Sequence, residues 1–344
     1  MLELRHARWI AVAAALAAAL AAPAHAAEIE LVATHFVSAQ HGVQVDMLEP
    51  WAAELERRTG GRVHVTIHPG GSALGNINKQ YDQVRAGVTD IAFGLNGIPR
   101  GRFPRTSIMA LPFMTASADA ATRALWDVFP EYLAEEYPGV HVLALTAHNG
   151  GMIHTVDKKV TTAEDLAGLR IRAPSPEVTS MLEYLGASPV GMPPGEVYES
   201  LQRGVLDGAI FPWDPVKSMH IAEVVRYHLE IGCYTVPFYL VINERRWQGL
   251  PAEVRQAIDD ISGPALIEQF GGWWDKWDAA GRAAAVERGN VISTLSDAER
   301  AAWRLRLEPM IEAWLAGLED QGVDNAREIY DAMRARIVVH EATH

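Results

Sequence analysis

The sequence predicts an α/β protein whose chain is long enough to build two hydrophobic cores. Apolar runs of strand length alternate with longer stretches of helical periodicity, which is the pattern of a largely parallel sheet with helices on both faces. The chain has 344 residues, of which 49% are hydrophobic, so it can bury more than one small core. The chain contains neither an internal repeat nor a low-complexity linker. If there are two lobes, the chain must cross between them as ordered structure.

The amino terminus has the features of a secretory signal peptide. Arg5 and Arg8 precede an apolar run from Trp9 to Ala22, and residues 23–26 fit a small-x-small cleavage site. The alternative is a membrane anchor, but about 14 apolar residues fall short of the roughly 20 that a spanning helix needs. We therefore expect export to the periplasm, removal of residues 1–26 and no direct membrane insertion afterwards.

The overall composition excludes some partners and sites. There are 30 Lys and Arg against 43 Asp and Glu, a formal net charge of −13. Such an acidic chain is not expected to bind nucleic acid or an anionic membrane surface, so a bound anion needs a local positive field. The single cysteine, Cys233, excludes an intramolecular disulfide, and its apolar neighbours indicate a buried structural thiol.

The first unit reads as alternating strands and helices. A strand is expected over 30–34 and a helix over 42–59. The apolar residues of this helix lie on one face, and Gly60-Gly61 ends it. Alternation over 63–67 predicts the next strand. The remaining elements expected in this unit are a helix over 76–85, a strand over 90–93, a helix over 118–137 and a strand over 140–146.

The second unit begins near Gly150. Residues 162–165 have the pattern of a capped helix start. Strands are expected over 170–172, 187–190 and 208–211, and the run 234–243 is expected to return to the first lobe.

A helical pattern continues over 251–288, about 38 residues or roughly 57 Å. It is interrupted by Gly263-Pro264 and Gly271-Gly272, so the alternative is two helices kinked at Gly263-Pro264. A strand over 290–295 and closing helices from Ser296 complete the chain.

The most informative residue is Arg172. It lies at the end of a short apolar strand and is followed by Ala173-Pro174 and by a helix that is expected to begin near Ser175. A strand's carboxyl end beside a helix N-terminus favours an anion, and a guanidinium can hold a carboxylate through two parallel hydrogen bonds. Arg170 lies on the same strand face, so periodicity alone does not choose between the two arginines.

This segment resembles the substrate-binding proteins of TRAP (tripartite ATP-independent periplasmic) transporters, the C4-dicarboxylate-binding family. Relatives carry an L-K-I-R-V-P-like strand, which reads 169–174 here, and the resemblance selects Arg172. It continues with fixed spacing through the stretches 185–189, 192–193, 196–198, 201–204 and 206–208, and more weakly from about Glu30 to the last long helix.

The resemblance implies a two-lobed fold of the periplasmic binding protein type, with mixed, mostly parallel sheets, a ligand cleft between the lobes and a long helix that braces both. We expect lobe I to comprise residues 27–149 and about 235–277. Lobe II would comprise 150–234 and about 278–335, and 336–344 would be a frayed tail. The resemblance also implies delivery of the ligand to TRAP membrane permease subunits.

This sequence departs from the family pattern at two positions. Phe211 stands where many relatives have an asparagine before the proline, and Gly150-Gly151 leads to His154 where relatives often supply a second arginine. Loss of a second fixed cation favours a monocarboxylate over a dianion. His154 is either a replacement donor or a buried strand residue, and Phe211 and Trp213 are either pocket wall or ordinary core.

From the first lobe, the loops at strand ends are candidates, because ligands of open α/β sheets bind outside the carboxyl ends of strands. The expected ligand-binding residues are Arg172, His154, Phe211, Trp213, His35, Phe36 and Asn96. Further candidates at the strand ends of the first lobe are Thr34, Ser38, His41, Phe93 and Leu95.

Two motifs resemble metal or enzyme sites. His340-Glu341-Ala342-Thr343-His344 matches the zinc-peptidase pattern H-E-x-x-H, but it runs to the end of the sequence given and a frayed tail is expected. Residues 70–75 fail both the nucleophile-elbow and phosphate-loop patterns. We therefore expect no catalytic residue, metal or cofactor.

The predicted function is capture of a small organic acid, which is a monocarboxylate, a sugar acid or a hydroxy or oxo acid, for a TRAP transporter. A periplasmic hydrolase or zinc-dependent enzyme and a ligand-binding sensory subunit are the alternatives.

Overall fold

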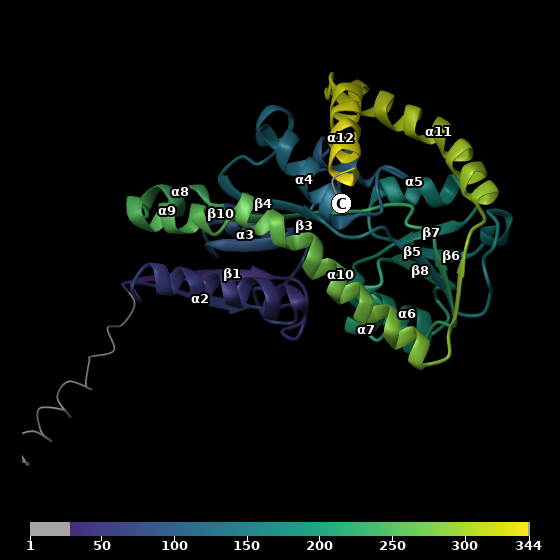
Figure 1. Cartoon of the computed structure of the whole chain (residues 1–344), viewed down its shortest axis with the longest axis horizontal. Coiled ribbons are helices and arrows are strands. Elements are labelled where there is room, and N and C mark those ends of the chain that lie inside the picture. Colours follow the sequence, from purple (N-terminus) through teal and green to yellow (C-terminus); the bar gives the residue numbers. More distant parts are fainter. Residues whose placement is uncertain (1–27, 343–344) are drawn as a thin grey trace, which may run out of the picture.

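A computed structural model shows two mixed β-sheets side by side, each covered by helices (Figure 1). The structure describes residues 28–342. The signal peptide expected over residues 1–26 and the last histidine of the terminal motif lie outside this range.

The first sheet has the strand order β2-β1-β3-β10-β4. β1 pairs in parallel with β2 and β3, whereas β10 runs antiparallel to both β3 and β4. β10 thus brings the chain back into the first sheet after the strands β5 to β9. The strands are β1 (Ile29–His35), β2 (Val63–His68), β3 (Ile91–Leu95), β4 (Val140–Ala147) and β10 (Pro237–Asn243).

The second sheet has the order β11-β9-β5-β8-β6-β7. β6 pairs in parallel with β7 and β8, and β5 runs antiparallel to β8 and β9. The strands are β5 (Met152–Thr155), β6 (Arg170–Ala173), β7 (Ser188–Gly191), β8 (Gly208–Phe211), β9 (Tyr227–Glu230) and β11 (Val291–Thr294). The sequence prediction omitted β9 and included β5 only as an alternative, through His154 as a buried strand residue.

The helices cover the sheets and connect their strands. Several expected helices are shorter than predicted. The helix expected over 42–59 begins with a π-helical turn at Val43–Leu48 and is α-helical only from Glu49, and the helix expected over 76–85 begins at Gln80. The stretch 162–165 gives only a 3₁₀ turn at Glu164–Leu166, and α4 changes to a π-helical turn at Phe129, where Pro130 lacks an N–H. The helices are α2 (Glu49–Arg58), α3 (Gln80–Ala86), α4 (Ala118–Val128), α5 (Pro176–Tyr184), α6 (Val197–Gln202), α7 (Asp214–Ser218), α8 (Glu244–Gly249), α9 (Ala252–Asp260), α10 (Pro264–Glu287), α11 (Asp297–Asp320) and α12 (Ala326–Glu341).

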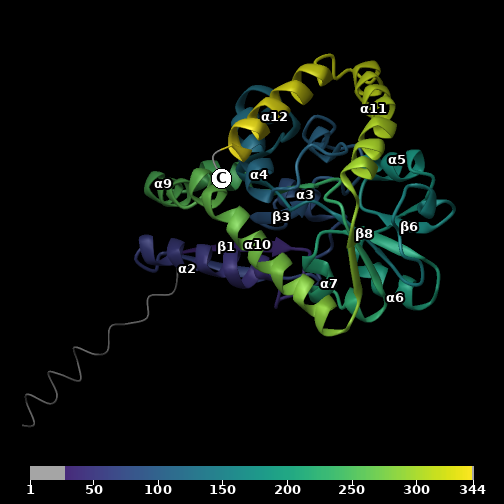
Figure 2. The same ribbon diagram turned by 45° about the vertical axis from the view of Figure 1, so that its right-hand side comes forward.

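α10 braces the two sheet units. It packs against α4 and β4 of the first unit and against α7 and β11 of the second, and it runs diagonally across both in Figures 1 and 2. The long helical segment therefore exists, but it divides at Gly263, whose φ of 49° breaks the helix between α9 and α10. The 24 residues of α10 span about 36 Å at 1.5 Å per residue.

The C-terminal helix α12 corrects the expectation of a frayed tail from residue 336. α12 continues to Glu341 because Tyr330, Met333 and Ile337 bury one of its faces. It packs mainly against α4, beside the first sheet, although residues to 335 were expected in lobe II. In the part of the chain that the structure describes, no helix combines the length and apolar character needed to cross a membrane.

Candidate ligand-binding site

A cavity of about 60 Å³ lies between the two sheets. This is several times the roughly 10–15 Å³ that one water molecule needs, so the space admits a small ligand. Its walls come from the ends of β1, β3 and β10 on one side and of β6 and β8 on the other, with α10 behind. The site therefore lies where strand ends of both sheets meet.

Arg172 on β6 lines this cavity and is only 1% exposed. Its Nε donates to the carbonyl of Met192 at 3.1 Å and its Nη1 to that of Ile210 at 3.2 Å. The guanidinium carbon lies 4.2 Å from the centroid of the Phe211 ring, a cation-π arrangement. None of the carboxylates that the structure describes forms an ion pair with it.

These contacts leave part of the guanidinium available. One N–H of Nη1 and both of Nη2 have no acceptor among the described residues, and they form the end of the fork that a carboxylate can grip through two parallel bonds. Burial lowers the pKa of Arg172 to about 10, so the group still carries its charge at neutral pH. A buried cation with no counter-ion is costly unless a ligand supplies the anion.

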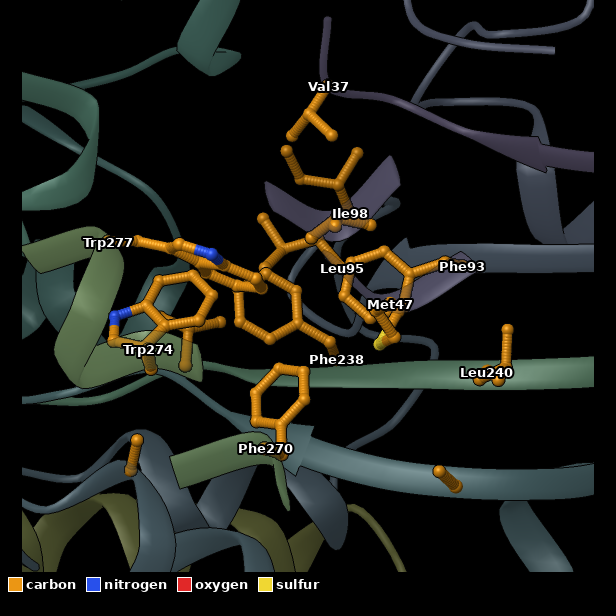
Figure 3. Close-up of a cluster of buried hydrophobic side chains, with 14 of the residues drawn as sticks. Val37, Met47, Phe93, Leu95, Ile98, Phe238, Leu240, Phe270, Trp274 and Trp277 are labelled. Atoms are coloured by element: carbon orange, nitrogen blue, oxygen red, sulfur yellow. The ribbon is translucent and has the colours of Figure 1, made fainter. Parts of the chain in front are cut away.

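Aromatic rings form most of the apolar wall. Phe36 and Phe93 stack with centroids 6.2 Å apart, and Phe238 stacks on Phe93 at 5.3 Å. Trp274 of α10 continues this group, with its ring 5.6 Å from that of Phe238. Figure 3 shows the rings of Phe93, Phe238 and Trp274 gathered together. The walls therefore fit a flat, apolar ligand body.

Among the cavity residues that the sequence prediction omitted are His148 and Tyr234. The Nε2 of His148 accepts from the backbone N–H of Val236 at 3.1 Å, so Nδ1 carries the proton and donates to the Asn149 carbonyl. The Tyr234 ring meets the His148 ring edge-on, at 5.2 Å. Burial lowers the pKa of His148 to about 4. The imidazole is therefore neutral and presents a ring rather than a charge; its place just after the strand 140–146 was the signal that could have identified it.

A polar contact closes another part of the cavity wall. His41, which follows β1, places Nε2 2.7 Å from Oδ2 of Asp214, the first residue of α7. Both residues line the cavity, and the contact joins segments 173 positions apart. It links the first sheet unit to the second at the cavity wall.

Three of the residues expected at the site, Arg172, Phe36 and Phe211, line the cavity. His35 and Asn96 are buried but engaged elsewhere: His35 Nε2 contacts Gln44 Oε1 at 2.9 Å, and the Asn96 amide donates to the Tyr137 hydroxyl at 2.7 Å. Neither is among the cavity-lining residues, because β1 and β3 direct these side chains into the surrounding protein.

The other two expected residues, His154 and Trp213, lie outside the cavity, near Phe211, which lines it. His154 is fully buried between β8 and β9, with Nδ1 2.7 Å from Nδ1 of His228 and Nε2 3.2 Å from the Phe211 carbonyl. Trp213 donates to Glu230 at 3.2 Å. Neither side chain lines the cavity, and burial holds the pKa of His154 well below its usual value.

The remaining sequence motifs lie away from the cavity. Arg170 is exposed and pairs with Asp207 at 2.7 Å on the surface. His340 of the terminal motif contacts Asp127 at 2.9 Å on the outside of α4. In the range 28–342, no group of three or more His, Cys, Asp or Glu side chains is placed to hold a metal ion.

Comparison with known proteins identifies the family. Residues 33–317 match the family described as bacterial extracellular solute-binding protein, family 7 (DctP). A protein of Comamonas testosteroni named outer membrane transporter protein TsaT is 27% identical over 330 residues, covering 94% of this chain and 96% of that protein.

Solved structures agree. A TRAP solute-binding protein from Rhodoferax ferrireducens, in complex with copurified benzoate, has a TM-score of 0.87 and 35% identity, covering 91% of this chain and 99% of that one. A marine-metagenome TRAP solute-binding protein specific for aromatic acid ligands, in complex with 3-hydroxybenzoate, has a TM-score of 0.88 and 31% identity, with the same coverage. The chain thus belongs to family 7 of the bacterial extracellular solute-binding proteins and has the fold of the TRAP type.

Proposed function

We propose that this protein captures an aromatic monocarboxylate through an Arg172–carboxylate pair and delivers it to the membrane permease of a TRAP transporter. The observation that carries the proposal is a buried arginine, free of any described counter-ion, that opens into a cavity walled by aromatic rings. No covalent chemistry is required.

The charge of the cavity favours one carboxylate rather than two. Arg172 is the only Lys or Arg among the described residues that line it, and the carboxylate of Asp214 lines it too. A second ligand carboxylate would meet apolar walls or this aspartate, and either contact costs free energy. Phe211 also favours a single carboxylate, because it places an apolar ring where many relatives have an asparagine.

The stacked rings of Phe36, Phe93 and Phe238 supply flat apolar area for a ligand ring. Aromatic pairs contribute about 0.5–1.5 kcal/mol beyond the burial of their area. The benzoate and 3-hydroxybenzoate bound in two similar structures are acids of this shape. We infer that Phe36 and Phe211 contact the ligand, and that His154, Trp213, His35 and Asn96 support the walls from behind.

Export and delivery complete the proposal. The basic and apolar start of the chain favours a cleaved leader and a periplasmic protein, and membership of the family favours a permease as the partner.

Thermal-shift and calorimetric titration of the mature protein test the proposal with benzoate, 3-hydroxybenzoate and mandelate against succinate and glucuronate. We expect an aromatic acid to bind, and at 100 times its Kd to stabilise the protein by about 2.7 kcal/mol. Binding should survive exhaustive chelation. Preferential binding of succinate or glucuronate, or loss of binding on chelation, contradicts the proposal.

A further inference from the structure

Two opposite charges line the same cavity without neutralising each other. Arg172 bonds to two backbone carbonyls and Asp214 bonds to His41 and Ser218, and no ion pair joins the arginine to the aspartate. The cavity thus offers an anion-binding end and, separately, a hydrogen-bond acceptor.

The Asp214 carboxylate is held by one oxygen. Oδ2 receives a hydrogen bond from His41 Nε2 at 2.7 Å and from Ser218 Oγ at 3.0 Å. Within the described part of the chain no residue donates to Oδ1, and Oδ1 is not among the polar atoms sealed from solvent. The residue is only 7% exposed and lines the cavity, so a ligand bound there can supply the missing donor.

His41 cannot turn away to serve the ligand itself. Its Nδ1 accepts from the backbone N–H of Val43 at 3.0 Å, so the proton of the neutral ring is on Nε2 and is directed at Asp214. The imidazole also packs against the Trp277 ring in a T-shaped arrangement, with centroids 5.4 Å apart. The aspartate is therefore fixed in position, and its second oxygen remains the free acceptor.

We propose that Oδ1 of Asp214 accepts a hydrogen bond from a hydroxyl group on the ligand ring, so that the preferred ligand is a hydroxylated aromatic monocarboxylate. This rests on the proposed function and narrows it. With Arg172 on the carboxylate, an unsubstituted ring would place its apolar edge against a buried carboxylate, which costs free energy. A hydroxyl donor instead forms a charge-assisted bond, about twice as strong as a neutral one.

Calorimetric titration with five acids tests this: benzoate, 3- and 4-hydroxybenzoate, and their methoxy counterparts, which can accept but not donate. The mature wild-type protein should bind one hydroxybenzoate roughly 10- to 100-fold more tightly than benzoate, and its methoxy counterpart should lose that gain. Asp214→Ala should reduce the hydroxybenzoate-to-benzoate ratio to within about 3-fold, and Asp214→Asn should give an intermediate ratio.

The affinity ratio separates recognition from closure, because any weakening of the His41 contact affects both acids alike. Glu199→Ala, at an exposed carboxylate of α6, is the matched control and should keep the wild-type ratio. Equal binding of benzoate and both hydroxybenzoates by the wild type, or an unchanged ratio in Asp214→Ala, overturns the inference while leaving aromatic-acid capture intact. If no aromatic acid binds, the proposed function itself fails, and this inference with it.

Discussion

The guanidinium of Arg172 lies over the ring of Phe211, with the arginine carbon 4.2 Å from the ring centroid. The two residues lie near the ends of neighbouring strands, β6 and β8, which run parallel. The ring covers one face of the cation, and the carbonyls of Met192 and Ile210 orient it. The guanidinium N–H groups that would bind the ligand are therefore held in position before the ligand binds, which lowers the entropy cost of binding.

A pair of glycines on α10 tests the brace between the units. A Cβ at Gly281 would lie 1.9 Å from the carbonyl oxygen of Trp213, whereas a Cβ at Gly272 would meet nothing within 4 Å. Gly281→Ala must move helix or backbone and should destabilise the protein by about 1–3 kcal/mol. Gly272→Ala should instead stabilise it by about 0.5–1 kcal/mol. Urea unfolding of both variants measures this, and equal effects would contradict the described packing.

The buried histidines predict a loss of stability in mild acid. Burial lowers the pKa of His228 to about 4 and that of His154 well below 6.5. Between pH 6.5 and 4 the unfolded chain binds protons that the native protein does not, so the free energy of unfolding falls as the pH falls through this window. For His228 the loss is on the order of 3 kcal/mol.

Chemical denaturation at several pH values measures this slope. His228→Asn should flatten it between pH 6.5 and 4. His220→Asn is the control, since His220 is exposed and has a φ of 59°, a conformation that Asn tolerates well. An unchanged slope in His228→Asn would show that other groups control the acid transition.

Closure around the ligand is the third expectation. The contact between His41 and Asp214 joins the two units, and Arg172 is nearly completely buried, so we expect a ligand to enter when the units separate and to be held when they close. Small-angle scattering should show a smaller radius of gyration with a saturating aromatic acid than without it. His41→Ala should weaken binding through loss of the contact between the units. An unchanged radius, with binding confirmed by calorimetry, would argue against a hinge.

The sequence was informative where the relevant contacts are local. Arg172, Pro174 and the capping Ser175 follow one another along the chain, so the arginine at a strand end beside a helix was predictable. Phe36 was predictable in the same way, because it directly follows β1.

The rest of the site depends on contacts that no local pattern encodes. His41 and Asp214 are 173 positions apart and meet only when the units close. His154 was expected as a ligand donor or a buried strand residue, and it is a buried strand residue, because pairing of β5 with the four-residue strand β9 places it against His228. The break at Gly263 was among the alternatives, and α12 is ordered by a surface on α4 that its own sequence does not reveal.

The central claim is that Arg172 holds the ligand carboxylate. Arg172→Lys keeps the charge but loses the planar fork, so it should weaken binding of an aromatic acid substantially. Arg172→Ala should weaken it more than Arg172→Lys does, by roughly 30-fold to several-thousand-fold relative to the wild type. Arg170→Ala is the matched control, because Arg170 is on the same strand but pairs with Asp207 at the surface.

Calorimetric titration of these three variants, each with a wild-type circular dichroism spectrum, is the most direct measurement. The account predicts near-wild-type affinity for Arg170→Ala and a large loss for both Arg172 variants. Wild-type affinity in Arg172→Lys together with loss of binding in Arg170→Ala would contradict it.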